Sequence, residues 1–396
     1  MQNQTNTVKP KRVLIFSLVY YPRVIGGAEV AIKEITDRIS SKDIQFDMIT
    51  LRKKGSSFEK IGNVNVYRVG LPWFGANMKS SQIFPLSKIL FPFQAFIKAL
   101  ELQKRNGYDA TWAMMASYAG FAAYLFKKVH NKVPFILSLQ EGDNFERREG
   151  IFGGLFKKIF THADFVQVIS KFLEDWARHM GTTCPITIVP NAVDLDLFSN
   201  RKSETELNDL KNKLGKKPGD VFLITTSRLV KKNATDDVID ALKLLPPNVK
   251  FLILGTGYQE EELKLRVKQN GLEGRVIFLG YISHLEMPQY LHASDIFVRP
   301  SLSEGFGNSY IEAMAAGIPV IATPIGGIVD FLVDRETGLL CDVNNPASIA
   351  KKVEEIMDDK DLRDRVVAKA LDMVKNKYQW SLIASDMKNK VFLSNI

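Results

Sequence analysis

Two glutamates with seven residues between them lie in a segment, 300–312, that is otherwise rich in small and polar residues. The segment follows an apolar run typical of a buried strand and begins a helical pattern. Gly305 and Gly307 would let backbone amides approach a ligand closely, and a helix N-terminus favours an anion such as a diphosphate. Glu304 precedes the helix and Glu312 lies about one turn inside it, so the two carboxylates can contact different parts of one ligand. Each can accept hydrogen bonds from vicinal hydroxyls, which sugars and riboses both have.

Cations follow an apolar run at residues 221–227. Arg228 comes directly after this run, and Lys231 and Lys232 come shortly after it. Because open α/β sheets bind ligands at the carboxyl ends of their strands, these side chains are candidates to neutralise a diphosphate. The alternative is that both lysines are solvated loop charges. Each glutamate of 300–312, taken alone, could likewise be an ordinary acidic residue that complements the helix dipole.

Two loops in the first half of the chain carry further candidates. Gly26 and Gly27 could open a helix N-terminus toward a phosphate, or simply form a tight strand-to-helix turn. Gln140, Glu141 and Asp143 follow a second apolar run. The glutamine can orient a hydroxyl but cannot titrate, so the two carboxylates are the ionisable candidates there. A polar loop that caps the next helix is an equal alternative.

Alternating strands and helices position these residues. Strands are expected at 12–17, 47–50, 64–68, 110–113, 135–139, 165–169 and 187–189, with helices at 28–41, 89–105, 117–128 and 171–180. After a break at 190–198 and a charged helical segment at 201–217, strands are expected at 221–227, 250–254, 276–279, 296–299, 320–323 and 338–341, with helices at 235–245, 258–270, 285–293, 310–316 and 346–358. This alternation predicts an α/β protein with parallel sheets and helices on both faces of each sheet.

Length and composition agree with two globular domains, since the chain has 396 residues of which 45% are hydrophobic. The two cysteines, Cys184 and Cys341, lie far apart, which indicates a reducing compartment and no disulfide framework. Residues 1–190 hold 26 Lys and Arg against 15 Asp and Glu and so carry a charge of +11, whereas the remainder holds 27 against 29 and carries −2. This asymmetry favours an anionic partner for the first half, with solubility as the alternative.

The glutamate segment resembles the Glu-x7-Glu motif of the retaining family 4 glycosyltransferases, which have the GT-B fold. Supporting segments occur in the family's order and spacing, at 189–194 with Phe198, 227–230, 254–257, 278–281, 312–317 and 326–327. The resemblance covers most of the chain. It implies two Rossmann-like doubly wound domains, face to face across a cleft: an acceptor-binding domain at 1–196 and a nucleotide-sugar-binding domain at 197–377. A C-terminal helix at 378–396 is expected to pack back on the first domain.

The resemblance also implies roles for individual residues. Glu304 would contact the transferred sugar and Glu312 the nucleotide ribose, while Arg228 and Lys232 would neutralise the diphosphate. Amides of residues 306–309 would bind sugar or phosphate. The further donor-binding residues would be Gly26, Gly27, Gly257, Tyr281, Ile282, Gly305, Phe306, Gly307, Asn308 and Ser309, with Tyr281 and Ile282 bracketing the base.

Two positions depart from the family pattern. The family pairs the arginine with a lysine five positions later, where this chain has Asn233, and we expect Lys232 to replace that lysine. Many members carry a histidine after the strand at 135–139, where this chain has Gln140. Gln140, Glu141 and Asp143 therefore remain as candidate contacts of the sugar or the acceptor.

No metal and no cofactor beyond the nucleotide sugar are expected. The histidines show no metal-ligand spacing. Asp194 and Asp196 formally match the Asp-x-Asp motif of metal-dependent transferases, but they lie in the segment between the two domains. Cations and helix dipoles are expected to balance the diphosphate charge instead.

The acceptor is the part that the sequence specifies least. The basic, aromatic stretches at 84–104 and 151–160 could lie in a membrane interface, which would suit a lipid-linked saccharide, or bury their apolar faces in the domain core. No run is long enough for a transmembrane helix, and the apolar run at 13–21 is interpreted as a first strand rather than a signal peptide. We expect a cytoplasmic protein with a peripheral contact at the inner face of the membrane. No nucleic-acid module is recognisable, so no nucleic-acid partner is expected.

The predicted activity is transfer of a sugar from a nucleoside diphosphate sugar to a hydroxyl of a saccharide or lipid-linked saccharide. Two alternatives remain open. A sugar-nucleotide epimerase would share the fold, although Glu304 in its motif argues against it. A donor-binding protein that has lost activity is suggested by Gln140 and Asn233.

Overall fold

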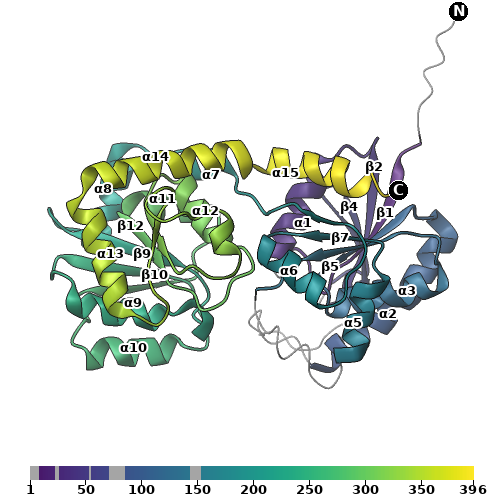
Figure 1. The fold of residues 1–396 in the computed structure, drawn as a ribbon, viewed down its shortest axis with the longest axis horizontal. Coiled ribbons are helices and arrows are strands. Elements are labelled where there is room, and N and C mark those ends of the chain that lie inside the picture. Colours follow the sequence, from purple (N-terminus) through teal and green to yellow (C-terminus); the bar gives the residue numbers. More distant parts are fainter. Residues whose placement is uncertain (1–8, 23–25, 53–54, 71–84, 143–152) are drawn as a thin grey trace, which may run out of the picture. The chain divides into compact units, whose positions relative to one another are not determined.

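The computed structural model describes residues 9–22, 26–52, 55–70, 85–142 and 153–396 (Figure 1). The chain divides into two compact units, each built around its own sheet. The first unit runs up to Pro190 and also includes Trp380–Ile396, and the second unit comprises Asn191–Gln379. Within the described ranges, no helix combines the length and apolar character that crossing a membrane requires.

The sheet of the first unit has the strand order β3-β4-β2-β1-β5-β6-β7-β8. Its strands are β1 (Lys11–Phe16), β2 (Ile44–Leu51), β3 (Phe58–Ile61), β4 (Val64–Val69), β5 (Ala110–Met114), β6 (Phe135–Leu139), β7 (Phe165–Val168) and β8 (Ile186–Ile188). All neighbours pair in parallel except β3, which is antiparallel to β4. The sequence did not predict β3, because this short edge strand alternates exposed and half-buried residues and lacks a buried apolar run.

Helices flank this first sheet (Figure 1). They are α1 (Gly27–Arg38), α2 (Pro85–Asn106), α3 (Tyr118–Val129), α5 (Gly153–His162), α6 (Lys171–His179) and α15 (Trp380–Asp386), which continues as a π-helix at Met387–Phe392. The end of the chain is fixed to this unit by packing and by charge. The Phe392 ring lies 5.1 Å from the ring of Trp112, and Lys388 Nζ lies 2.6 Å from an oxygen of Asp43.

The sheet of the second unit is entirely parallel, in the order β11-β10-β9-β12-β13-β14. Its strands are β9 (Val221–Thr226), β10 (Val249–Leu254), β11 (Val276–Gly280), β12 (Ile296–Arg299), β13 (Val320–Ala322) and β14 (Leu339–Leu340). Its helices are α7 (Leu195–Ser199), α8 (Glu204–Lys213), α9 (Thr235–Ala241), α10 (Glu260–Gln269), α11 (Met287–Ala293), α12 (Asn308–Ala315), α13 (Pro346–Asp358) and α14 (Lys360–Lys377). The expected doubly wound α/β architecture is confirmed in both units.

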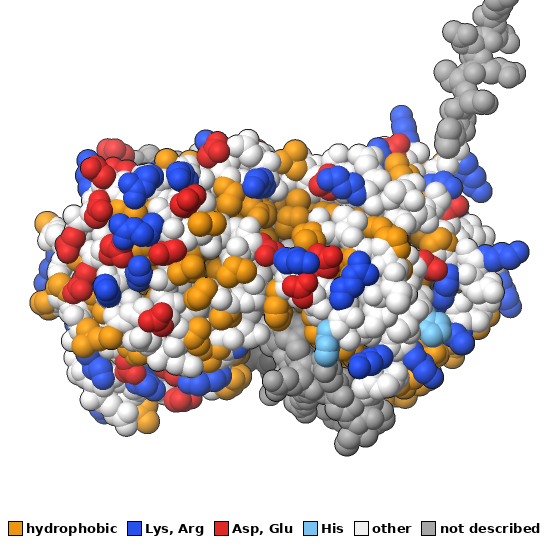
Figure 2. All heavy atoms as spheres, viewed as in Figure 1, with side chains coloured by type: hydrophobic (Ala, Val, Ile, Leu, Met, Phe, Trp, Pro, Cys, Tyr) orange, Lys and Arg blue, Asp and Glu red, His pale blue; other side chains and the backbone are white. Residues whose placement is uncertain are grey.

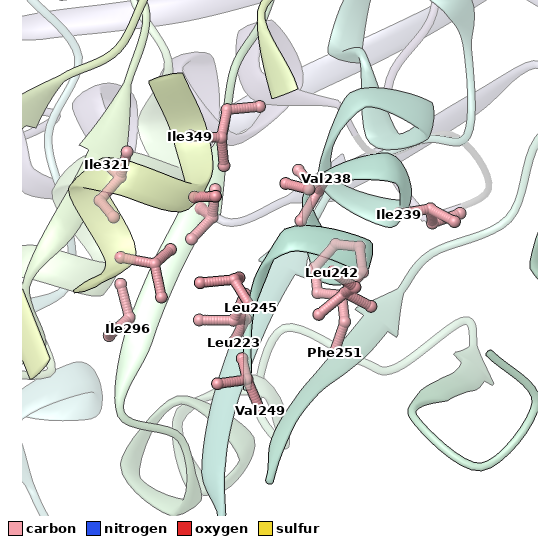
Figure 3. Packing of buried hydrophobic residues seen from close by; sticks show 14 of the residues in the cluster. Leu223, Val238, Ile239, Leu242, Leu245, Val249, Phe251, Ile296, Ile321 and Ile349 are labelled. Atoms are coloured by element: carbon pink, nitrogen blue, oxygen red, sulfur yellow. The ribbon is translucent and has the colours of Figure 1, made fainter. Parts of the chain in front are cut away.

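The core of the second unit fixes the strands whose ends carry the candidate site. Buried side chains of the sheet, such as Leu223, Phe251 and Ile321, pack with Val238 of α9 and Ile349 of α13 (Figure 3). Full burial of one such side chain contributes about 1.5–3 kcal/mol. Because many are buried together, the strands form a rigid platform for the loops at their carboxyl ends.

Candidate functional site

The predicted donor-site residues of the second unit lie on loops that follow β9, β10, β11 and β12 and in the helix α12. The strands are parallel, so all of these loops leave the same edge of the sheet. The strands β9 and β12 are neighbours in space but not consecutive in the chain, and the strand order reverses between them. Such a switch point is where open α/β sheets bind ligands.

The loops after β9 and β12 meet at this switch point. The first carries Arg228 and Lys232, and the second carries Glu304. The amide of Leu302 donates a hydrogen bond to the carbonyl of Lys232 at 2.6 Å, which ties the two loops together. The structure therefore brings Lys232 close to the first glutamate, on a loop that also carries Arg228.

Glu304 is held in place at its backbone and at its carboxylate. Its carbonyl accepts a hydrogen bond from the amide of Gly327 at 3.1 Å. Its Oε2 accepts one from Nη2 of Arg299 at 2.5 Å, and its Oε1 lies 3.9 Å from Nζ of Lys232. The side chain keeps 14% of its surface exposed, so Glu304 is not fully closed off from a ligand.

Arg299 is a residue that sequence reasoning missed. It ends β12, is buried, and donates hydrogen bonds to the hydroxyls of Ser301, Tyr310 and Ser309 as well as to Glu304. Its guanidinium also lies 4.3 Å from the centre of the Tyr310 ring. The sequence feature that could have indicated it is an arginine at the end of an otherwise apolar strand. An arginine at such a position is more often exposed to solvent.

The two adjacent lysines have different environments. Lys232 faces Glu304, whereas Lys231 forms an ion pair with Asp236 at 2.6 Å, a contact that raises the pKa of Lys231. Asn233 is buried, and its side-chain amide donates to the carbonyl of Arg228 at 2.6 Å. The asparagine thus stabilises the loop from which the exposed Arg228 side chain projects.

The N-terminus of α12 lies next in the chain after Glu304. Its cap residue, Gly307, has φ = 101°, a left-handed conformation that favours glycine, and it supplies no side chain to cap the helix. Among the described residues, the amides of Asn308 and Ser309 have no protein acceptor. Phe306 is buried and packs on Phe331 at 5.2 Å between ring centres, so only its backbone could meet a ligand.

Glu312 contacts the loop that follows β11. Its Oε1 lies 3.1 Å from Nε2 of His284, and the imidazole packs against the ring of Phe198 at 5.1 Å. Tyr281 on the same loop is exposed, and Ile282 is half-buried. His284 thus connects the predicted ribose contact, Glu312, to the loop that carries the predicted base contacts. No spacing pattern in the sequence singled out His284.

Gly257 follows β10 and is required by chain packing. A Cβ atom at this position would lie 2.0 Å from the carbonyl oxygen of Leu229. The amide of Leu229 in turn donates to the carbonyl of Thr256 at 3.1 Å. This close approach of two loops demands glycine whether or not a ligand is present.

The predicted residues of the first unit have partners within that unit. The amide of Gly26 donates to Oε2 of Glu29 at 2.7 Å, and both Gly26, which precedes α1, and Gly27, its first residue, are exposed. Glu141 is buried, and its oxygens accept hydrogen bonds from the amides of Ala116 and Gln140 at 2.7 and 2.9 Å. Glu141 therefore connects the loops after β5 and β6.

One predicted residue, Asp143, lies outside the described part of the chain. Within the ranges that the structure describes, no group of three or more His, Cys, Asp or Glu side chains could hold a metal ion.

Family models match most of the sequence. Residues 25–197 match the model of Glycosyltransferase Family 4, and residues 207–373 match that of Glycosyl transferases group 1. The chain is 26% identical to an uncharacterized glycosyltransferase of Methanocaldococcus jannaschii, over 96% of this chain and 97% of the relative. It is 24% identical to the 2-deoxystreptamine N-acetyl-D-glucosaminyltransferase of Niallia circulans, over 84% of this chain and 89% of the relative.

Solved structures agree in fold. HepE of Anabaena, determined in complex with UDP-glucose, superimposes with a TM-score of 0.77. The match covers 97% of this chain and 100% of HepE at 20% sequence identity.

Proposed function

The chain belongs to the family 4 type of glycosyltransferases and has the GT-B fold, and from this premise we propose that it is a retaining enzyme that uses a nucleoside diphosphate sugar. The acceptor in this proposal is a hydroxyl of a saccharide or of a lipid-linked saccharide. The observation that carries the proposal is the convergence of Glu304, Lys232 and the uncapped N-terminus of α12 at the switch point of the second sheet.

In this proposal, the role of each group follows from the charge that develops on the leaving diphosphate. As the bond between the sugar and the diphosphate breaks, negative charge grows on the departing phosphate oxygens. Arg228, Lys232 and the free amides at the start of α12 are fixed donors that would stabilise this charge, and no metal ion takes part. Glu304 would accept a hydrogen bond from a hydroxyl of the transferred sugar, and Glu312 one from the ribose.

The names of the similar proteins suggest which donors to test first. One relative transfers N-acetylglucosamine, and HepE was determined with UDP-glucose. Uridine diphosphate sugars with neutral hexoses or N-acetylhexosamines are therefore the first candidates.

A peripheral membrane contact through the first unit is part of the proposal. On α2, the apolar side chains Ile89, Phe93 and Ile97 are exposed and recur every four residues, on one face of the helix. The same helix ends in the exposed Lys104 and Arg105. An apolar stripe beside cations suits an anionic lipid surface. By contrast, Figure 2 shows acidic and basic side chains interspersed on the visible face of the second unit.

A donor-binding and turnover assay tests the proposed activity. The purified chain is incubated with a panel of nucleotide sugars and a membrane extract as acceptor source, and release of nucleoside diphosphate is measured. The anomeric configuration of the product is read by NMR. A new epimer without release of diphosphate would indicate an epimerase, and donor binding without turnover on any acceptor would indicate a protein that only binds the donor.

The division of roles between the two glutamates is tested by calorimetry. Glu312→Ala is expected to weaken binding of the bare nucleoside diphosphate as well as of the nucleotide sugar. Glu304→Ala is expected to weaken the nucleotide sugar alone. Equal losses for both ligands in both variants would contradict this division.

A further inference from the structure

The carboxylate of Glu304 does not stand alone in the site, because one of its oxygens is already paired. Oε2 accepts a charge-assisted hydrogen bond from Arg299 at 2.5 Å. Oε1 lies 3.9 Å from Nζ of Lys232, beyond hydrogen-bond distance. The two oxygens of one carboxylate therefore have unequal environments.

Arg299 cannot itself reach a ligand in this arrangement. Only 7% of its side chain is exposed, and its donors point to groups of the chain. Nε bonds the hydroxyls of Ser301 and Tyr310 at 3.1 Å each, and Nη1 bonds Ser309 at 2.6 Å. These hydrogen bonds hold the planar guanidinium in one orientation. Because Arg299 also bonds Glu304, this rigid neighbour sets the orientation of the carboxylate.

Because Oε2 is held in this way, the surface that Glu304 offers to a ligand is reduced. A free carboxylate can bind two adjacent hydroxyls with its two oxygens. Here Oε2 is bonded to Arg299, and Oε1, beside Lys232, is the oxygen left to accept a hydrogen bond from a ligand. This arrangement favours recognition of one hydroxyl group in one orientation. Recognition of a single hydroxyl distinguishes sugars that differ only in the configuration at that carbon.

We propose that Arg299 is a positioning residue that makes Glu304 selective for the sugar of the donor. It acts through Oε2 of Glu304 and does not touch the ligand. This inference rests on the proposed function, since it assumes that Glu304 contacts the sugar of a nucleotide sugar.

The experiment measures the sugar preference, defined as the Kd of UDP divided by the Kd of the best UDP-sugar, by titration calorimetry. Arg299→Met is expected to lower this preference about tenfold, the effect of losing one charge-assisted hydrogen bond. The Kd of UDP itself is expected to stay within about twofold, because the carboxylate that Arg299 orients is the one assigned to the sugar and Arg299 itself is buried. In a Glu304→Gln background, Arg299→Met should have little further effect on the preference.

Tyr310→Phe is the matched control for a purely structural effect. It removes a hydroxyl that bonds both the side chain and the carbonyl of Arg299, but it leaves the contact with Glu304. This variant should lower the melting temperature while keeping the sugar preference. If Arg299→Met does not fold, Arg299→Lys replaces it in the test. A lysine keeps the charge but cannot make all of these hydrogen bonds, so a smaller fall in the sugar preference is expected.

Three results would overturn the inference. They are an equal loss of UDP and UDP-sugar binding in the Arg299 variant, a fall in preference of the same size in Tyr310→Phe, and an undiminished effect of Arg299→Met in the Glu304→Gln background. Failure of the proposed function is recognised separately, since the unchanged protein would then bind no nucleotide sugar of the panel.

Discussion

The two units each place a glycine before a helix at the carboxyl edge of a parallel sheet, yet the two helix N-termini differ in one decisive respect. In the first unit, the third residue of α1 is Glu29, whose carboxylate accepts the amide of Gly26 at 2.7 Å. In the second unit, the third residue of α12 is Tyr310, and no side chain caps the helix. The first helix carries its own anion, whereas the second leaves its amides to a ligand.

This difference shows that a glycine before a helix is, by itself, a weak indicator of an anion-binding site. The positive end of a helix attracts an anion only while no carboxylate of the chain already occupies it. In the second unit, Lys232 adds positive charge beside Glu304, and at α1 the capping carboxylate offsets the dipole. The comparison ranks α12 above α1 as the candidate site for the diphosphate of the proposed donor.

Removing the cations beside α12 should have the largest effect. The double variant Arg228→Met with Lys232→Met is expected to lower the rate of transfer about 10²–10³-fold, because the two groups proposed to stabilise the leaving diphosphate are lost. Initial rates of diphosphate release measure this. Lys231→Met is the matched control, since Lys231 pairs with Asp236, and it should change the rate less than about twofold. Equal losses for both would show that general charge, rather than position, matters.

Alanine at the two cap glycines compares the helix N-termini directly. Gly307→Ala is expected to cost about 1–3 kcal/mol and to weaken nucleoside diphosphate binding, because φ is 101° and the new Cβ would lie 2.5 Å from Cδ2 of Tyr310. Gly26→Ala should cost less than about 1 kcal/mol, since φ is −126° and the nearest atom belongs to the flexible end of Glu29. Urea unfolding and calorimetry measure both. A larger loss of binding from Gly26→Ala would reverse the ranking.

The loop beside α12 should not accept the lysine of the family pattern. Asn233→Lys is expected to destabilise the second unit by about 1–2 kcal/mol, because the hydrogen bond to the carbonyl of Arg228 is lost at a buried position. The transfer rate should not rise. A stable and faster Asn233→Lys variant would show that Lys232 does not replace the missing lysine.

The smallest expected effect concerns Glu29, the carboxylate at the N-terminus of α1, and the pH dependence of stability. Burial raises the pKa of Glu29 above its ordinary value of 4.5, against the opposing effect of its backbone hydrogen bonds. The folded state therefore binds the proton more tightly than the unfolded state, and this residue's contribution to stability falls as the pH rises from the ordinary value through the raised one. Glu29→Gln should make the unfolding free energy less dependent on pH over this window. A steeper fall in the variant would contradict the assignment.

The sequence by itself predicted most of the strands and many of the helices, and it identified the central motif; the helix α14 (Lys360–Lys377) was not predicted. The strands β6 and β12 and the helix α13 have the predicted bounds, because continuous apolar runs and helical periodicity are local properties of the chain. It also placed Glu304 before α12 and Glu312 within it. The edge strand β3 escaped prediction because its pairing with β4, rather than a buried apolar run, defines it.

Only the tertiary structure decided which groups surround the two glutamates. Lys231 and Lys232 are equivalent in sequence, and the hydrogen bond between the loops after β9 and β12 determines which of them faces Glu304. Arg299 and His284 acquire their partners through burial and through contacts between loops that are separate in the chain. Such contacts depend on how strands are ordered in the sheet, which local periodicity does not encode.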